Sequence, residues 1–298
     1  PRSTQDSSSA ASDVYKRPAQ STYDDVYNIL QTNCATAYCH GPGNSSGLDL
    51  SGSSSDVYQA LFDVDPANAY SMGKKNKLVY PGNPYKSFLF RKINNELSPD
   101  VHLHTDEGAA MPKDQPGLDD KEIELVRQWI LYGAHETGEL VDKSLIDDYY
   151  DNFGVASMPN PPAPPAEGEG FQVHLGPFFL PPEGEQEIFY KWDTQIEDPI
   201  EITRIENHMG QFSHHFLLYK LNEGEDKSPG IRVGQDFQGV DLVSAWQFPG
   251  DFDLPLGTAY AWEGNTSLDL NSHYINYSQT NTTACEVYLN IYLSLIHI

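Results

Sequence analysis

The pattern of hydrophobic and polar positions changes about halfway along the chain. In residues 23–156, apolar side chains recur three and four positions apart, the spacing that places them on one face of a helix. In residues 171–292, short runs rich in β-branched and aromatic residues are separated by turn clusters, which is typical of strands. The sequence therefore predicts a multidomain protein, an all-α domain followed by an all-β domain with a jelly-roll or β-sandwich fold.

The last helix of the first region has the clearest boundaries. Ile123, Val126 and Ile130 share one apolar face, and Asp119 with Glu122 has the spacing of a capping box. Other helices are expected around 23–30, 56–62 and 85–93. In the second region we expect strands at 187–192, 200–202, 216–221 and 287–292, with turns at 222–224 and 263–265.

Segments of biased composition delimit the two regions. Residues 1–22 are rich in Ser, Ala and Gln and predict a flexible tether. Residues 157–170 begin with repeated prolines, which favour an extended spacer, so we expect a linker there. Residues 293–298 read LSLIHI, which is what a common sequencing adapter encodes in frame; the alternative is an ordinary strand end. We therefore expect a non-native tail after Tyr292.

The charge balance excludes some partners. The chain has 18 Lys and Arg residues against 43 Asp and Glu residues, a formal net charge of −25. Phosphate backbones and anionic lipid attract the opposite charge, so nucleic acid and anionic membranes are not expected partners. No run approaches the roughly 18 apolar residues that a transmembrane helix needs, so no such segment is expected.

Two of the three cysteines form the strongest chemical motif. Four residues separate Cys34 from Cys39, and His40 follows at once. Covalent haem needs two thiols and a histidine beside the second one, although C-x-x-C-H is the usual spacing. A zinc half-site would need two more soft ligands, and no second cysteine pair exists. A disulfide is the other alternative, and it leaves His40 unexplained.

The second region holds a candidate metal site. His214 and His215 are adjacent, and His273 lies further along the chain. Three imidazoles without a thiolate suit copper. Adjacent residues of a strand point to opposite faces, so both members of the pair can reach one ion only at a strand end or a bulge. Spacing alone leaves open whether these histidines bind a metal.

Residues 23–135 resemble a class I cytochrome c domain. The resemblance rests on the helix before the cysteine motif, on VYPGNP at 79–84, on GAAMP at 108–112 and on the closing helix that ends at Gly133. It implies covalent haem c held by Cys34, Cys39 and His40, with Met111 as the sixth ligand to iron. His102 and His104 are the rival ligands, and a methionine ligand implies a higher potential.

Residues 171–292 resemble the first catalytic domain of the copper type II, ascorbate-dependent monooxygenases, the family of peptidylglycine α-hydroxylating and dopamine β-monooxygenases. The resemblance rests on GPFFLPP at 176–182, on the histidine pair followed by an apolar strand, on LPLG at 254–257 and on the HYIN segment. It implies that His214, His215 and His273 bind one copper ion. Copper and haem c are therefore the expected cofactors.

The same family has a second copper, in a following jelly roll, held by an H-x-H pair and a Met. No H-x-H occurs after residue 104, so we expect a chain truncated at its C-terminus with no catalytic residue of its own. The full-length protein would be a copper-dependent monooxygenase that hydroxylates a C–H bond. Cys285 either pairs with a residue of the missing part or is a buried free thiol.

Taken together, these features predict an exported haem and copper redox protein, periplasmic or at the cell surface. The haem would pass electrons to the three-histidine copper site. The expected partners are a redox protein or small reductant and, for the full-length protein, O₂ and an organic substrate. The alternative is a non-catalytic electron-transfer or surface-binding module.

Overall fold

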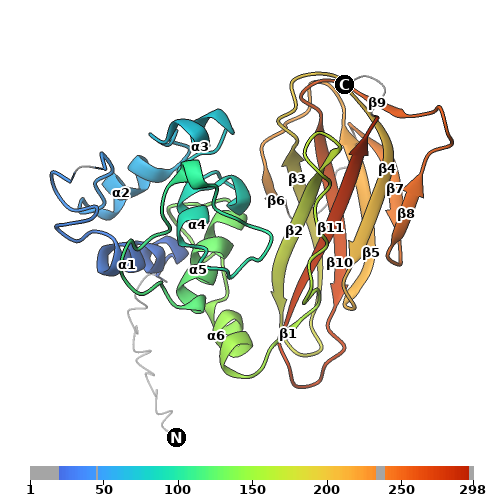
Figure 1. Cartoon of the computed structure of the whole chain (residues 1–298). Helices are drawn as coiled ribbons and strands as arrows, with labels where there is room; N and C mark the ends of the chain where they lie inside the picture. The colour runs from blue at the N-terminus through green and yellow to red at the C-terminus, as the bar shows by residue number, and fades with distance from the viewer. Residues whose placement is uncertain (1–19, 45, 233–238, 295–298) are drawn as a thin grey trace, which may run out of the picture.

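The computed structural model describes residues 20–44, 46–232 and 239–294 (Figure 1). It is mostly β, with 31% strand and 22% helix. The helices precede the strands along the chain and lie beside two sheets (Figure 1). In the described residues there are six short α-helices: α1 (Thr22–Asn33), α2 (Ser54–Leu61), α3 (Ala69–Gly73), α4 (Phe88–Ile93), α5 (Asp120–Leu131) and α6 (Lys143–Asp151).

The predicted fold class, an all-α cytochrome c-like domain followed by an all-β domain, is wrong. The stretches between the helices, rich in Gly, Pro, Ser and Asn, form turns and loops, because these residues favour turns over helix interiors. Two isolated β-bridges lie among them, Phe62 with Val79 and Lys77 with Ser87. In addition, β1 (Val155–Ala156) falls inside the region predicted to be helical and pairs in parallel with β11 (Thr283–Leu293).

The helices expected around 23–30, 56–62 and 119–133 are present as α1, α2 and α5, whereas the segment 85–93 is divided into a 3-10 turn at Pro84–Lys86 and helix α4. Capping side chains explain where α1 and α5 begin. At α5, the Asp119 side chain accepts from the Glu122 N–H while the Glu122 side chain accepts from the Asp119 N–H, so the predicted capping box is confirmed. Ser21 and Asp24 form the same arrangement at α1. The faces of α1 and α5 meet where Tyr23 stacks on Trp129, with ring centroids 5.3 Å apart.

The two sheets face each other across a common core. One contains β2 (Gly170–Leu180), β11, β4 (Ile200–Met209), β8 (Gly250–Asp253) and β9 (Tyr260–Trp262), with β1 added to β11. The other has the order β6 (Gly230–Arg232), β3 (Glu185–Asp193), β10 (Ser267–Ile275), β5 (Ser213–Leu221) and β7 (Val240–Trp246). Leu175 and Leu289 from the first sheet share one buried cluster with Tyr190, Leu218 and Leu270 from the second. Each sheet therefore buries one face.

The helices pack against the side of the sheets where β2 and β6 lie (Figure 1). The Tyr85 hydroxyl donates to the carbonyl of Gly176 at 3.0 Å, and the Gln128 amide donates to the carbonyl of Pro177 at 2.8 Å. Tyr190 of β3 donates from its hydroxyl to the carbonyl of Gly82. These contacts join the helical region to the strands through both side chains and backbone.

The predicted linker lies along this assembly. The Gln172 amide donates to the carbonyl of Pro162, and the Asn290 amide donates to the carbonyl of Ala163, each at 3.0 Å. Most of the predicted tether, residues 1–19, and the last four residues of the predicted tail, 295–298, lie outside the described residues.

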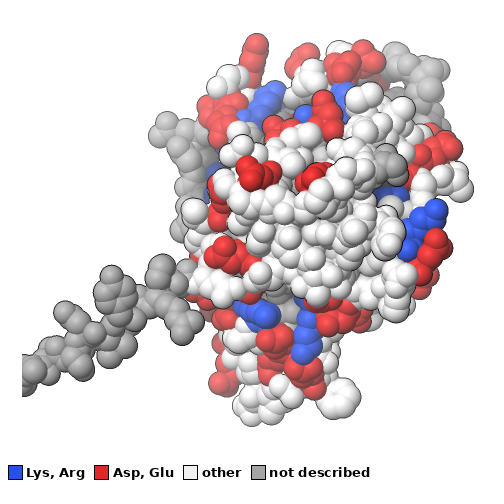
Figure 2. All heavy atoms as spheres, turned by 90° about the vertical axis from the view of Figure 1, so that its left-hand side faces the viewer, with Lys and Arg blue, Asp and Glu red and all other residues white. Residues whose placement is uncertain are grey.

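None of the helices in the described ranges combines the length and the apolar character needed to cross a membrane. Figure 2 shows the face formed by the helical side, where acidic residues outnumber basic ones around an uncharged centre.

Candidate functional site

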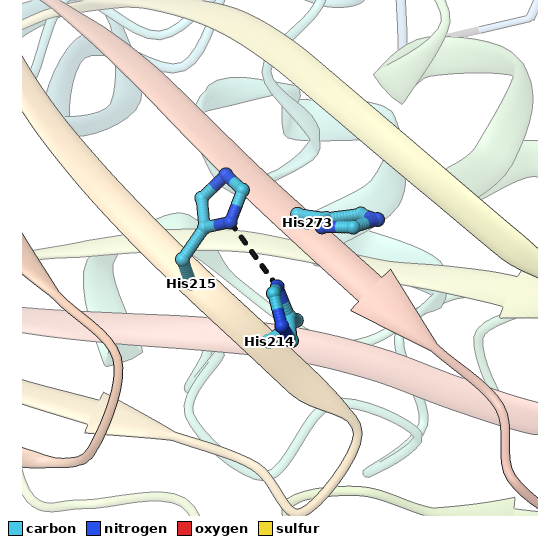
Figure 3. Close-up of side chains that lie close together, drawn as sticks. All are labelled: His214, His215 and His273. Atoms are coloured by element: carbon cyan, nitrogen blue, oxygen red, sulfur yellow. Dashed lines mark hydrogen bonds between the residues drawn. The ribbon is translucent and has the colours of Figure 1, made fainter.

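Three histidines gather on two neighbouring strands of the five-stranded sheet (Figure 3). His214 and His215 lie at the start of β5, and His215 stands directly opposite His273 of β10. One ring nitrogen from each of the three lies within 4.8 Å of the others. Within the described residues, these three side chains form the cluster of His, Cys, Asp or Glu that lies close enough together to hold a metal ion.

The backbone explains how two adjacent histidines can serve one site. His214 follows the first residue of β5, and the pairing of β5 with β10 shifts register between His273 and Tyr274. The regular alternation of side chains is therefore interrupted where the pair lies. The Nδ1 atoms of His214 and His215 are 3.4 Å apart, and the His273 ring centroid is 5.0 Å from each of the other two (Figure 3).

One of the three histidines, His215, has a shifted pKa. Partial burial lowers the pKa of His215, and the nearby His273 ring lowers it further, while Glu187 opposes this. A neutral imidazole presents a lone pair, so a lowered pKa reduces competition from protons. Three imidazoles without a thiolate are a donor set that suits copper, and zinc also accepts such ligands.

Sequence analysis did not identify the acidic residues beside this cluster. Glu185 and Glu187 of β3 lie next to β10, and Asn271 is buried at the same face. Their signal in the sequence was weak. Two glutamates two residues apart in a strand lie on the same face of a sheet. Only the pairing of β3 with β10 shows that His273 lies on that face too.

The cysteine motif lies on the turn that follows α1. Cys34 and Cys39 are both free thiols and partly buried. The Nδ1 atom of His40 is 3.1 Å from the carbonyl oxygen of Leu48. The Ser46 hydroxyl oxygen lies 3.0 Å from the same nitrogen. The tautomer with the proton on Nδ1 donates to the Leu48 carbonyl and leaves the lone pair of Nε2 for a metal. Two free thiols with a histidine beside the second are the residue types that covalent haem needs.

Met111 is partly buried against the helical core, as are Cys34 and Leu48. Its backbone N–H donates to the carbonyl of Lys92 at 2.7 Å, which holds this part of the loop on α4. His104 has a structural role instead: its Nδ1 accepts from the Asp106 N–H, and its ring stacks on Tyr70 at 4.2 Å. Met111 thus lies against the same helical core as Cys34, whereas His104 and His102 are exposed.

Burial raises the pKa of the Cys34 thiol to about 11 and that of the Cys285 thiol to about 12. In the haem-free protein at pH 8, the thiolate fraction of Cys34 should therefore be about one in a thousand. We expect its alkylation by iodoacetamide to be slow at pH 8 and to accelerate about tenfold per pH unit. Peptide mass spectrometry measures this, with the unfolded protein as control; equal rates in the folded and unfolded protein would contradict it.

His174 forms a buried cluster with two carboxylates that the sequence did not indicate. Its Nδ1 is 3.0 Å from Asp100 Oδ2, and its Nε2 is 2.8 Å from Glu286 Oε2. The ring stacks on Tyr288 at 3.9 Å. Asp100 comes from the helical region and Glu286 from β11, so His174 joins the two parts of the molecule. It borders a cavity of about 330 Å³ at this junction.

Comparison with protein-family models and with curated proteins found no match to this chain. The arguments for function therefore rest on the residues and their geometry.

Proposed function

We propose that this chain is a redox protein that binds one copper ion at His214, His215 and His273 and haem c at Cys34, Cys39 and His40. The observation that carries the proposal is the convergence of the three histidines, whose ring nitrogens lie within 4.8 Å of one another. Three imidazoles from two strands are a ligand set that would accept both Cu(I) and Cu(II).

The cysteine motif supports the second half of the proposal. The two thiols would hold the haem vinyl groups, His40 would provide one axial nitrogen, and Met111 would provide a thioether. Bound haem supplies a one-electron donor or acceptor, and bound copper supplies a one-electron store. A chain with both groups fits the electron-supplying half of a copper type II monooxygenase.

The proposed partners follow from this chemistry. A redox protein or small reductant would deliver electrons, and O₂ with an organic substrate would be consumed by a copper type II monooxygenase. Covalent haem attachment and copper loading both favour a location outside the cytoplasm, in a periplasm or at the cell surface.

Counting electrons tests the proposed function. The protein would be matured with haem, loaded with Cu(II) and titrated anaerobically with dithionite, while the haem spectrum and the Cu(II) EPR signal are followed. We expect each chain to accept two electrons, and the His273→Ala variant to accept one. A wild-type chain that accepts only one electron, or none, would contradict the proposal.

The sixth iron ligand provides a separate prediction. Met111→Ala should leave the haem covalently attached but change the low-spin spectrum and lower the potential, because loss of the thioether removes its preference for Fe(II). His102→Ala should change neither. Absorption spectroscopy and redox potentiometry distinguish the two, and the reverse result would assign the ligand to His102.

A further inference from the structure

The outer face of the five-stranded sheet carries a row of side chains that runs across three strands. Glu187 of β3 stands directly opposite His273 of β10, which stands directly opposite His215 of β5. Glu185 lies two residues before Glu187 on the same strand and therefore on the same face. The histidine cluster is thus bordered on one side by two carboxylates.

The contacts within this row are specific. His273 donates from Nε2 to Glu185 Oε1 at 2.8 Å. His215 Nε2 lies 3.6 Å from Glu187 Oε1, too long for a hydrogen bond but close enough for an electrostatic interaction. The buried Asn271 amide donates to the same Glu187 oxygen at 3.1 Å and so orients that carboxylate. In both histidines, the nitrogen that faces a carboxylate is Nε2.

The hydrogen bond to Glu185 determines which nitrogen of His273 can bind a metal. A proton held on Nε2 by a carboxylate leaves the lone pair on Nδ1. The Nδ1 atoms of His214 and His215 already face each other at 3.4 Å. A carboxylate beside the ring nitrogen that does not bind the metal, here called the outer nitrogen, orients a ligating histidine and makes it a stronger donor to the metal. Loss of such a carboxylate typically costs 10–100-fold in metal affinity.

We infer that Glu185 and Glu187 are positioning residues of the metal site, which orient His273 and His215 through their outer nitrogens and bias the site toward Cu(II). The inference rests on the proposed function. The bias follows from charge, because a carboxylate attracts a doubly charged ion about twice as strongly as a singly charged one at the same distance.

Competition titrations with Cu(II) and Cu(I) chelators on the full chain test the inference. Glu185→Gln should lower the affinity for Cu(II) by about 10–100-fold, and Glu187→Gln should have a smaller effect in the same direction. The affinity for Cu(I) should fall about tenfold less, which raises the copper potential by about 59 mV. A purely structural role would lower both affinities equally.

Glu263→Gln is the matched control, because it removes the same charge from an exposed turn before β10. The side chains of Glu185 and Glu187 are 64% and 48% exposed, so their replacement by Gln should leave the thermal unfolding temperature unchanged. Gln variants that bind both ions like the wild type would overturn this inference alone. A wild-type chain that binds no copper would overturn the proposed function as well.

Discussion

Replacing His174 with alanine should destabilise the protein by about 3–5 kcal/mol, because it removes one partner of a buried charge cluster. His174 is 5% exposed, and the Asp100 and Glu286 side chains that flank it are 9% and 11% exposed. Without the imidazole, both carboxylates lose a donor in a place that water hardly reaches. Chemical denaturation measures the change in the free energy of unfolding.

His208→Ala is the control for this substitution. His208 also lies on a strand of the first sheet and near a carboxylate, at 3.6 Å from Glu206, but its side chain is 35% exposed. A weak, accessible contact of this kind contributes about 0–1 kcal/mol. Equal losses of unfolding free energy for the two variants would show that the buried carboxylates around His174 do not add to its contribution to stability.

The same cluster should make stability depend on pH. The pKa of His174 is raised above its ordinary value: burial lowers it, but Asp100 and Glu286 together outweigh that effect. A raised folded-state pKa means that this stabilisation is complete below about pH 6.5 and is lost as pH rises through the folded value. The groups around the ring are Asp100, Glu286, Tyr85 and Tyr288, with Arg127 near Asp100.

Thermal unfolding of the wild type and of His174→Gln from pH 5 to pH 9 measures this dependence. The stability of the wild type should fall more steeply above pH 6.5 than that of the variant, because glutamine does not titrate. The pKa of Asp100 is lowered, chiefly by the charge on His174 against the cost of burial, so the contact also weakens in acid as that carboxyl protonates. Parallel curves above pH 6.5 would contradict the assignment.

The other large effect concerns the cysteines. The double variant Cys34→Ala/Cys39→Ala should carry no covalent haem after expression with a cytochrome maturation system, because each thioether bond needs one of these thiols. Cys39→Ala alone should weaken or abolish attachment. Haem staining after denaturing electrophoresis gives the result. Cys285→Ala is the control and should keep its haem, because that thiol is fully buried among the strands.

If wild-type haem washes out completely under denaturing conditions, the covalent assignment is wrong. If haem stays attached in the double variant, another residue must hold it. Both outcomes concern only the helical region and leave the histidine cluster untouched.

The spacing of apolar residues and the capping residues predicted individual helices and strands better than they predicted the fold class. The spacing of Ile123, Val126 and Ile130 and the Asp119 cap predicted α5, and the strands at 187–192, 216–221 and 287–292 lie within β3, β5 and β11. The all-α assignment was wrong because it extended the helical pattern over segments that form loops. The two-residue strand β1 could not be predicted, since it exists only through pairing with residues more than 120 positions away.

The same distinction applies to the sites. Residue type and adjacency suggested the three histidines, but their convergence depends on the register of β5 against β10 and its shift at His273. Glu185 and His174 were missed because their partners come from other strands or from the helical region. A single sequence does not show which strands are neighbours, so contacts across the sheet are hidden in it.

Copper stoichiometry tests the central claim most directly. The full chain, loaded with Cu(II), freed of excess metal by gel filtration and analysed by elemental mass spectrometry, should retain one copper per chain. His214→Ala, His215→Ala and His273→Ala should each retain much less than one, while His208→Ala, whose ring lies outside the cluster, should retain one. Equal copper in the wild type and in all three variants, or none in the wild type, would contradict the account.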